Sequence, residues 1–133
     1  MPKDLSRLSA AERRALTAYQ DALLQRLPTQ VRRLIVYGSR VRGDANPDSD
    51  LDVAVIVEGQ DTRGPDGWRP APFSDPVWQA IVDTACDVSL VHDLYISPFV
   101  LTEDRLDETS PFIQAIRLEG VEVWSRENER VSG

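Results

Sequence analysis

The stretch from Tyr37 to Val57 constrains this chain more than any other. An apolar run ends at Tyr37 and is followed by Gly38-Ser39, a basic turn and a polar loop. A second apolar run begins after Asp50. Apolar runs of this length bounded by Gly, Asn and Pro are typical of buried strands. We therefore expect, in order, a strand over 30–37, a tight or helical turn over 38–43, a loop over 44–49 and a second strand over 50–57.

Helical and strand patterns alternate in the rest of the chain, which indicates an α/β (α+β) fold. Capping patterns predict helices that begin at Ser9, at Asp75-Pro76 and at Ser110-Pro111. We expect these helices to end near Leu27, near Asp93 and at Gly120, the last acting as a left-handed cap. Two further strands are predicted, one over 94–102 with Pro98 at an edge or bulge, and one over 121–124.

The length of 133 residues fits a single domain over 1–133. Within it we expect a long loop over 58–74 and a flexible tail over 126–133. No apolar run approaches the roughly 20 residues that cross a bilayer, and the first residues lack a signal-peptide core. We therefore expect a cytoplasmic protein without membrane contact. The single cysteine, Cys86, excludes an internal disulfide and is expected to be a small buried side chain.

The net charge of −7 is unevenly spread. Residues 1–43 hold nine Lys or Arg and three Asp or Glu, while residues 44–133 hold six and nineteen. The overall acidity argues against a general nucleic-acid binder, so RNA is an unlikely partner. The basic residues near the glycine turn, however, could attract a polyphosphate locally.

Asp50 and Asp52 bring two carboxylates to the start of the second strand. Residues two apart on a strand point the same way, so both can reach one divalent cation or bridge two, and hard oxygen ligands suit Mg²⁺. At the preceding turn, Gly38 allows close backbone approach to a phosphate, and the Ser39 hydroxyl can donate to it. The neighbouring Arg40 and Arg42 add positive charge. These are the parts needed for phosphoryl or nucleotidyl transfer.

The segments Gly38-Ser39-Arg40-Val41-Arg42-Gly43 and Ser49-Asp50-Leu51-Asp52-Val53-Ala54-Val55 resemble the signature of the DNA polymerase β-type nucleotidyltransferase superfamily, in particular its minimal nucleotidyltransferase branch. The resemblance implies a mixed sheet of about four strands flanked by helices. It also implies a nucleoside triphosphate, expected to be ATP, near Gly38 and Ser39, with Mg²⁺ on Asp50 and Asp52. Members of that branch are often encoded beside a helical HEPN protein, and some act as antitoxins by transferring AMP to it.

The family pattern also requires a third carboxylate on a later strand, where it prepares the attacking hydroxyl. Asp87 would serve if residues 86–91 formed a strand, but their periodicity predicts a helix. The strand that follows has no acid, so Ser97 would then stand where the carboxylate is expected. Asp93, just before that strand, is a further candidate.

Three functional hypotheses follow. The first is a nucleotidyltransferase that moves a nucleoside monophosphate from the triphosphate onto a hydroxyl of a protein, a small molecule or an RNA end. The second is a catalytically weak or inactive antitoxin or binding module that neutralises a HEPN-type partner. The third is a cation-dependent phosphohydrolase, for which the sequence offers no identifiable nucleophile or water-positioning acid.

Overall fold

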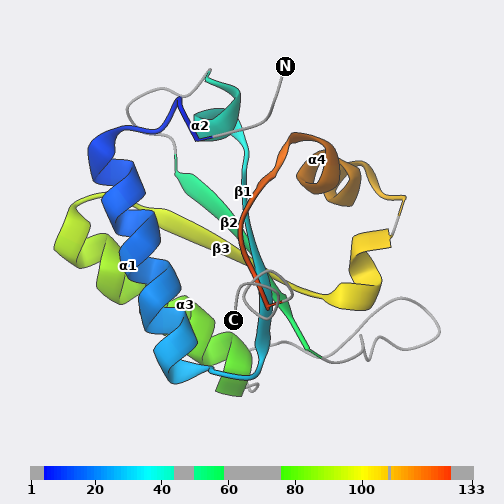
Figure 1. Cartoon of the computed structure of the whole chain (residues 1–133), viewed down its shortest axis with the longest axis horizontal. Helices are drawn as coiled ribbons and strands as arrows, with labels where there is room; N and C mark the ends of the chain where they lie inside the picture. Colours follow the sequence, from blue (N-terminus) through cyan, green and yellow to red (C-terminus); the bar gives the residue numbers. More distant parts are fainter. Residues whose placement is uncertain (1–4, 44–49, 59–75, 108, 127–133) are drawn as a thin grey trace.

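The computed structural model describes residues 5–43, 50–58, 76–107 and 109–126. Its centre is a four-stranded sheet in the order β3-β2-β1-β4 (Figure 1). The sheet is mixed, because β1 pairs antiparallel with both β2 and β4 whereas β2 pairs parallel with β3. The strands are β1 (Val31–Tyr37), β2 (Leu51–Val57), β3 (Ile96–Thr102) and β4 (Val121–Ser125). The predicted mixed sheet is confirmed, and Pro98 lies on an edge strand as expected.

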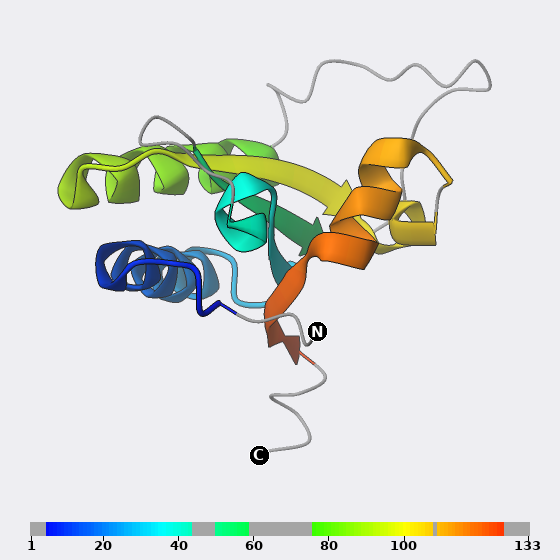
Figure 2. The same cartoon turned by 90° about the horizontal axis from the view of Figure 1, so that it is seen from above.

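Helices α1 (Ala10–Arg26) and α3 (Pro76–His92) cover one face of the sheet (Figures 1 and 2). The Ser9 capping box at the start of α1 is present, with the Ser9 amide donating to Glu12 Oε1 at 2.7 Å and the Glu12 amide donating to Ser9 Oγ at 3.1 Å. The Tyr19 hydroxyl donates to the Ile81 carbonyl oxygen at 3.1 Å and joins the two helices. The larger of two apolar clusters fills this layer.

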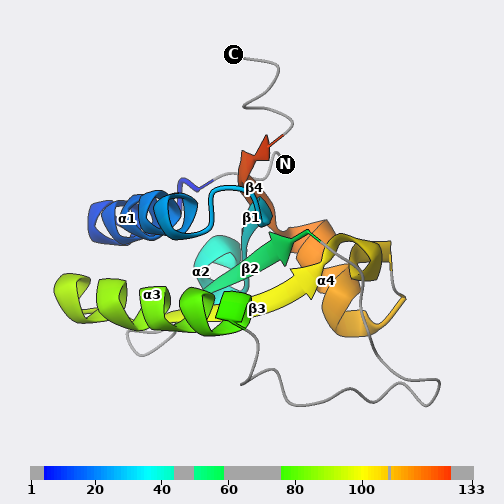
Figure 3. The ribbon, with the colours of Figure 1, turned by 90° about the horizontal axis from the view of Figure 1, so that it is seen from below.

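Helix α4 (Pro111–Glu119) and the short 3-10 helix η2 (Glu103–Asp107) lie on the other face (Figure 3). Ser110 caps α4 as predicted, accepting a hydrogen bond from the Ile113 amide. Ile113 and Ile116 are buried, but Leu118 is exposed. Gly120 is not the left-handed cap that we expected, because its φ is −70°. The glycine is needed for packing instead, since a Cβ there would overlap the Ile116 carbonyl oxygen and the Ile35 side chain.

Cys86 is exposed on α3, which corrects the prediction of a buried thiol. The buried stripe of this helix consists of Ile81, Thr84, Ala85 and Val88. Cys86 therefore lies on the face of α3 that points away from the core. The helical state of residues 86–91 agrees with the periodicity prediction, although their composition alone would also suit a strand.

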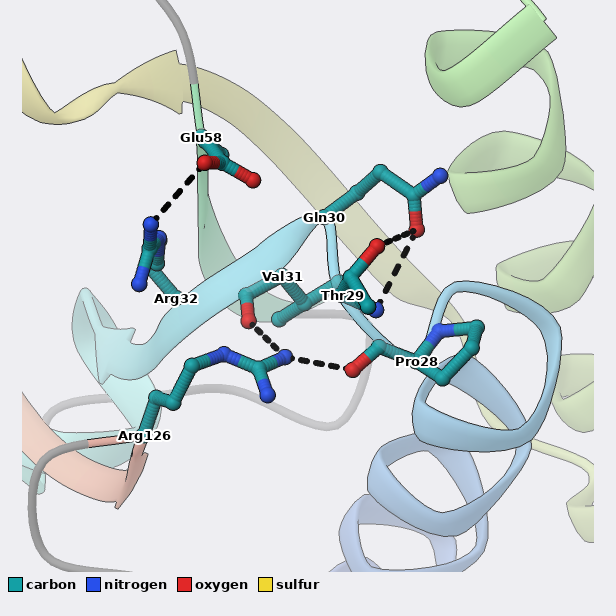
Figure 4. A network of polar contacts seen from close by, with 7 residues as sticks. All are labelled: Pro28, Thr29, Gln30, Val31, Arg32, Glu58 and Arg126. Carbon is teal, nitrogen blue, oxygen red and sulfur yellow. Dashed lines mark hydrogen bonds and ion pairs between the residues drawn. The ribbon is translucent and has the colours of Figure 1, made fainter. Parts of the chain in front are cut away.

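The start of β1 is tied to the far end of the described chain by a polar network (Figure 4). One guanidinium nitrogen of Arg126 donates to the carbonyl oxygens of Pro28 at 2.7 Å and Val31 at 2.8 Å. Nearby, Arg32 of β1 pairs at 3.0 Å with Glu58, which directly follows β2. This network lies at the end of the sheet opposite Gly38, so it stabilises the scaffold rather than the candidate site.

The predicted loop over 44–49, the helix cap at Asp75, nearly all of the predicted loop over 58–74 and most of the predicted tail lie outside the described residues. Within the described parts of the chain, no helix is both long and apolar enough to cross a membrane.

Candidate functional site

Residues 38–43, here called the phosphate turn after the ligand that the sequence predicts for it, leave the end of β1 through two glycines in unusual conformations. Gly38 has φ +89° and ψ −162°, and Gly43 has φ +90°. Between them lies the single-turn helix α2 (Ser39–Arg42), whose Val41 and Arg42 amides both donate to the Gly38 carbonyl oxygen at 3.1 Å. The chain reverses within six residues because glycine tolerates positive φ at both ends.

Gly38 lies directly against the carboxylate of Asp52. A Cβ added at Gly38 would overlap Asp52 Oδ2. No side chain can therefore be placed at Gly38 without displacing that carboxylate. The structure thus joins two parts that are separate in the sequence, the glycine turn and the second aspartate, into one surface.

Asp52 is the central member of a row across three strands. Tyr37 on β1 is its antiparallel partner, and Ser97 on β3 is its parallel partner. Two residues away along each strand lies the row of Ile35, Ala54 and Phe99, whose side chains belong to the apolar cluster under α4. Because side chains alternate along a strand, Asp52, Tyr37 and Ser97 face the α4 side of the sheet as well.

Burial raises the pKa of Asp52, the charge of Asp50 raises it further, and the guanidinium of Arg42 partly opposes both. These effects place Asp50 and Arg42 each within electrostatic reach of Asp52. Burial, assisted by the negative charge of Asp52, also raises the pKa of Tyr37 to about 12. The Tyr37 phenol therefore stays protonated near neutral pH.

The two arginines of the phosphate turn are held by different acids. Nε of Arg40 lies 3.0 Å from Glu12 Oε2, and the two side chains are only 22% and 10% exposed. Nη1 of Arg42 lies 3.1 Å from Glu119 Oε2 at the end of α4, with exposures of 45% and 39%. Arg40 is thus anchored to α1 in a largely buried pair, whereas Arg42 forms an exposed pair that solvent screens.

An aromatic group covers the inner side of the row that contains Asp52. The ring of Phe112 on α4 contacts Tyr37 edge to face, with centroids 5.8 Å apart. The same ring contacts Phe99 at 4.8 Å. Phe112 is nevertheless 47% exposed, so it forms an apolar border beside Tyr37 rather than part of a closed core.

Asp87 does not meet the condition under which it was considered as the third carboxylate. It lies on α3, not on a strand, and its Oδ2 pairs with Nη2 of Arg26 at 3.1 Å. Asp93 follows α3 with φ +53°, before β3 begins. Strand β3 itself contains no acid, and Ser97 stands opposite Asp52. Among the described residues, no three acids, histidines or cysteines gather closely enough to hold a metal ion.

Sequence reasoning missed Glu12, Glu119 and Arg7 as neighbours of the phosphate turn. Glu12 was recognised only as a capping residue, because nothing in the local pattern reveals its second contact with Arg40. Glu119 reaches Arg42 from the other end of the chain. Arg7 packs on Gly43 from the segment that precedes α1. Only the excess of basic residues in the first part of the chain hinted at such a cluster.

Two sequence matches relate this chain to known proteins. A family model described as a nucleotidyltransferase domain matches residues 16–130. A protein of Methanocaldococcus jannaschii named "Putative protein adenylyltransferase MJ0141" is 32% identical over 97 residues, which cover 73% of this chain and 83% of that protein.

Two solved structures are also similar. One is a "putative nucleotidyltransferase" from Sulfolobus solfataricus, at 16% identity and a TM-score of 0.46, with 93% of this chain and 95% of that chain covered. The other is a mutant of the toxin-antitoxin MntA-HpeT, at 14% identity and a TM-score of 0.49, with 82% and 73% covered. Both TM-scores are low, so the family assignment rests on the two sequence matches.

Proposed function

We propose, because this chain belongs to the nucleotidyltransferase domain family, that it binds a nucleoside triphosphate with a divalent cation and transfers the nucleoside monophosphate to a hydroxyl group. One observation carries the proposal, namely the packing of Gly38 against the Asp52 carboxylate. A turn suited to phosphate and a carboxylate suited to a cation share one surface, as a cation-bound triphosphate requires.

The acids at this site fit a divalent cation. Asp52 is partly desolvated and lies within the field of Asp50, which raises its pKa. A cation held by both carboxylates would relieve that repulsion and favour the charged state of Asp52. We propose Asp50 and Asp52 as the residues that hold Mg²⁺, as one ion or two. When bound, Mg²⁺ would neutralise charge on the phosphate oxygens.

The remaining roles fall to residues of the phosphate turn. We propose that the Ser39 hydroxyl donates to a phosphate oxygen next to Gly38. Arg42 can exchange its exposed pair with Glu119 for a phosphate oxygen, since such a pair contributes only about 0–1 kcal/mol. In the transfer, the acceptor hydroxyl loses its proton to solvent, its oxygen forms a bond to the α-phosphorus, the bond from that phosphorus to the α–β bridging oxygen breaks, and pyrophosphate leaves. Arg40, which was predicted to bind nucleotide, has the supporting role of anchoring α2.

We propose ATP as the triphosphate and a hydroxyl side chain of a partner protein as the acceptor. The name of the Methanocaldococcus jannaschii relative supports AMP transfer to protein. The net charge of −7 disfavours an RNA acceptor, because nucleic acid would be repelled. Following the resemblance in the sequence, the proposed partner is a helical HEPN-type protein in a toxin-antitoxin pair, and the proposed compartment is the cytoplasm.

Calorimetric titration of the full chain with ATP and with GTP, each with Mg²⁺, tests the binding step. Binding of at least one nucleotide is expected, and Asp50→Asn combined with Asp52→Asn should abolish the Mg²⁺-dependent part. Arg14→Gln, an exposed change on α1, serves as the unaffected control. If neither nucleotide binds, or if the double variant behaves like wild type, the proposed function is wrong.

The position of Ser97 favours a second candidate function, a binding module with little or no transfer activity. Ser97 stands beside Asp52, where the family pattern calls for a carboxylate, and β3 contains no acid. Loss of a general base reduces rates by about 10²–10⁴. Incubation with ATP labelled at the α-phosphate and a HEPN-type partner separates the two functions. Label on the partner requires catalysis, whereas a stable complex that remains unlabelled indicates the binding module.

A further inference from the structure

Arg7 lies directly over the end of the phosphate turn. A Cβ added at Gly43 would overlap Nη1 of Arg7 and come within 2.9 Å of its Cζ, so the guanidinium packs on the Gly43 α-carbon. In Figures 1 and 2 the segment before α1 runs beside α2. The contact joins the first described residues to the turn that follows β1.

The backbone that carries Arg7 is fixed on both sides. Leu8 is 5% exposed and belongs to the larger apolar cluster. Its amide donates to the Leu5 carbonyl oxygen at 3.0 Å, and Nη2 of Arg13 donates to the same oxygen at 2.6 Å. Ser9 then caps α1. The exposed Arg7 side chain therefore extends from an anchored turn, which limits the positions that its guanidinium can reach.

Arg7 differs in its electrostatic environment from Arg40 and Arg42, the two arginines of the phosphate turn. Arg40 pairs with Glu12, and Arg42 pairs with Glu119. Within the described parts of the chain, Arg7 has no carboxylate within ion-pair distance. Its positive charge at the turn is therefore not neutralised, and a polyphosphate bound there would gain from it.

We infer that Arg7 is a phosphate-binding residue of this site and that it contacts the polyphosphate of the bound nucleotide. Arg40 cannot take this role without leaving a largely buried glutamate unpaired, which is costly. Arg7 can take it without breaking any ion pair. The inference rests on the proposed function and extends it, because it assigns to the phosphate turn a cation from outside the Gly38–Gly43 motif.

The test compares Arg7→Gln with Arg14→Gln in the full chain. Both positions are exposed, both substitutions remove one positive charge, and Arg14 lies away from the turn on α1. Calorimetry measures binding of ATP and of inorganic tripolyphosphate, each with Mg²⁺. Arg7→Gln should weaken both probes by about tenfold, in the range expected for one exposed charge-assisted contact. Arg14→Gln should remain within about twofold of wild type. The thermal midpoints without ligand should stay equal, because neither arginine forms an ion pair with another described residue.

Two results would overturn the assignment of Arg7. One is unchanged binding of both probes by Arg7→Gln. The other is a loss confined to ATP, because a phosphate contact must weaken tripolyphosphate as well. If wild type binds neither probe, the proposed function fails together with the inference. If wild type binds and Arg7→Gln binds equally well, only the inference fails.

Discussion

Gly38→Ala tests the link between the phosphate turn and Asp52. Gly38 has φ +89° and ψ −162°, a region that costs other residues roughly 1–3 kcal/mol. The new methyl group would also overlap Asp52 Oδ2, and moving that carboxylate off its rotamer adds about 0.5–1.5 kcal/mol. Restriction of the unfolded chain returns roughly 0.4–1 kcal/mol. From the middle of these ranges, the free energy of unfolding should fall by about 2 kcal/mol.

Gly43→Ala is the matched control, because Gly43 also has a positive φ, of +90°, with ψ 10°. The left-handed region costs an alanine roughly 1–2 kcal/mol, and the same return from the unfolded chain leaves a loss of about 1 kcal/mol. The new methyl group would meet the end of the flexible Arg7 side chain rather than Asp52. That side chain can move away at little cost.

Urea unfolding and Mn²⁺ binding without nucleotide distinguish the two variants. Mn²⁺ serves as a paramagnetic substitute for Mg²⁺, and broadening of the Asp52 signal in NMR spectra reports its binding. Gly38→Ala should weaken Mn²⁺ binding by about 10-fold or more, as expected when a group that orients a metal ligand is disturbed. Gly43→Ala should not weaken it. The reasoning would be refuted if Gly38→Ala bound Mn²⁺ with wild-type affinity. It would also be refuted if the two variants lost equal amounts of unfolding free energy and of Mn²⁺ affinity.

Four further predictions concern the charges around this site. Asp50→Asn should lower the pKa of Asp52 and Arg42→Gln should raise it, as NMR titration of the carboxyl carbon can measure; no change in either variant would contradict the assigned causes. Because the folded-state pKa of Asp52 is raised, the folded protein binds more protons than the unfolded chain between the ordinary and the raised value. Stability should therefore fall as pH rises through that window, and Asp52→Asn should remove this slope from unfolding curves measured against pH. Ser97→Asp should raise the rate of AMP transfer by about 10²-fold, because it would supply a carboxylate beside Asp52, and Ser97→Asn should not raise it. Equal transfer rates of the two variants in a labelled-ATP assay would show that the lack of an acid at Ser97 does not limit the reaction. Glu12→Gln should lower the free energy of unfolding, measured in urea, by about 2–3 kcal/mol, because it disturbs both the capping box and the ion pair with Arg40. A loss below about 0.5 kcal/mol, as at an ordinary surface position, would show that the ion pair contributes little.

Much of the fold could be predicted because its signals are local. The Ser9 capping box, the apolar run from Val53 to Val57 and the Pro111 helix start each depend on neighbouring residues, and each appears where expected. The family resemblance over Tyr37 to Val57 is confirmed by the family model. The prediction for Gly120 is wrong because glycine is needed there to fit against the Ile116 carbonyl oxygen and against Ile35, a residue far away in the chain. Cys86 was misjudged because a one-residue change of helical phase moves a side chain from the core to solvent.

The sequence by itself determined the strands, the glycine turn over 38–43 and the pair of aspartates, because glycine conformations, strand periodicity and two-residue spacing are properties of short segments. The mixed sheet was implied by the family resemblance. Only the tertiary structure decided which distant residues join them. The register between β2 and β3 placed Ser97, not an acid, beside Asp52. The packing of α1 and α4 gave Arg40 to Glu12, Arg42 to Glu119, and Arg7 to the surface of Gly43. These pairings depend on strand register and helix packing, to which no local pattern is sensitive.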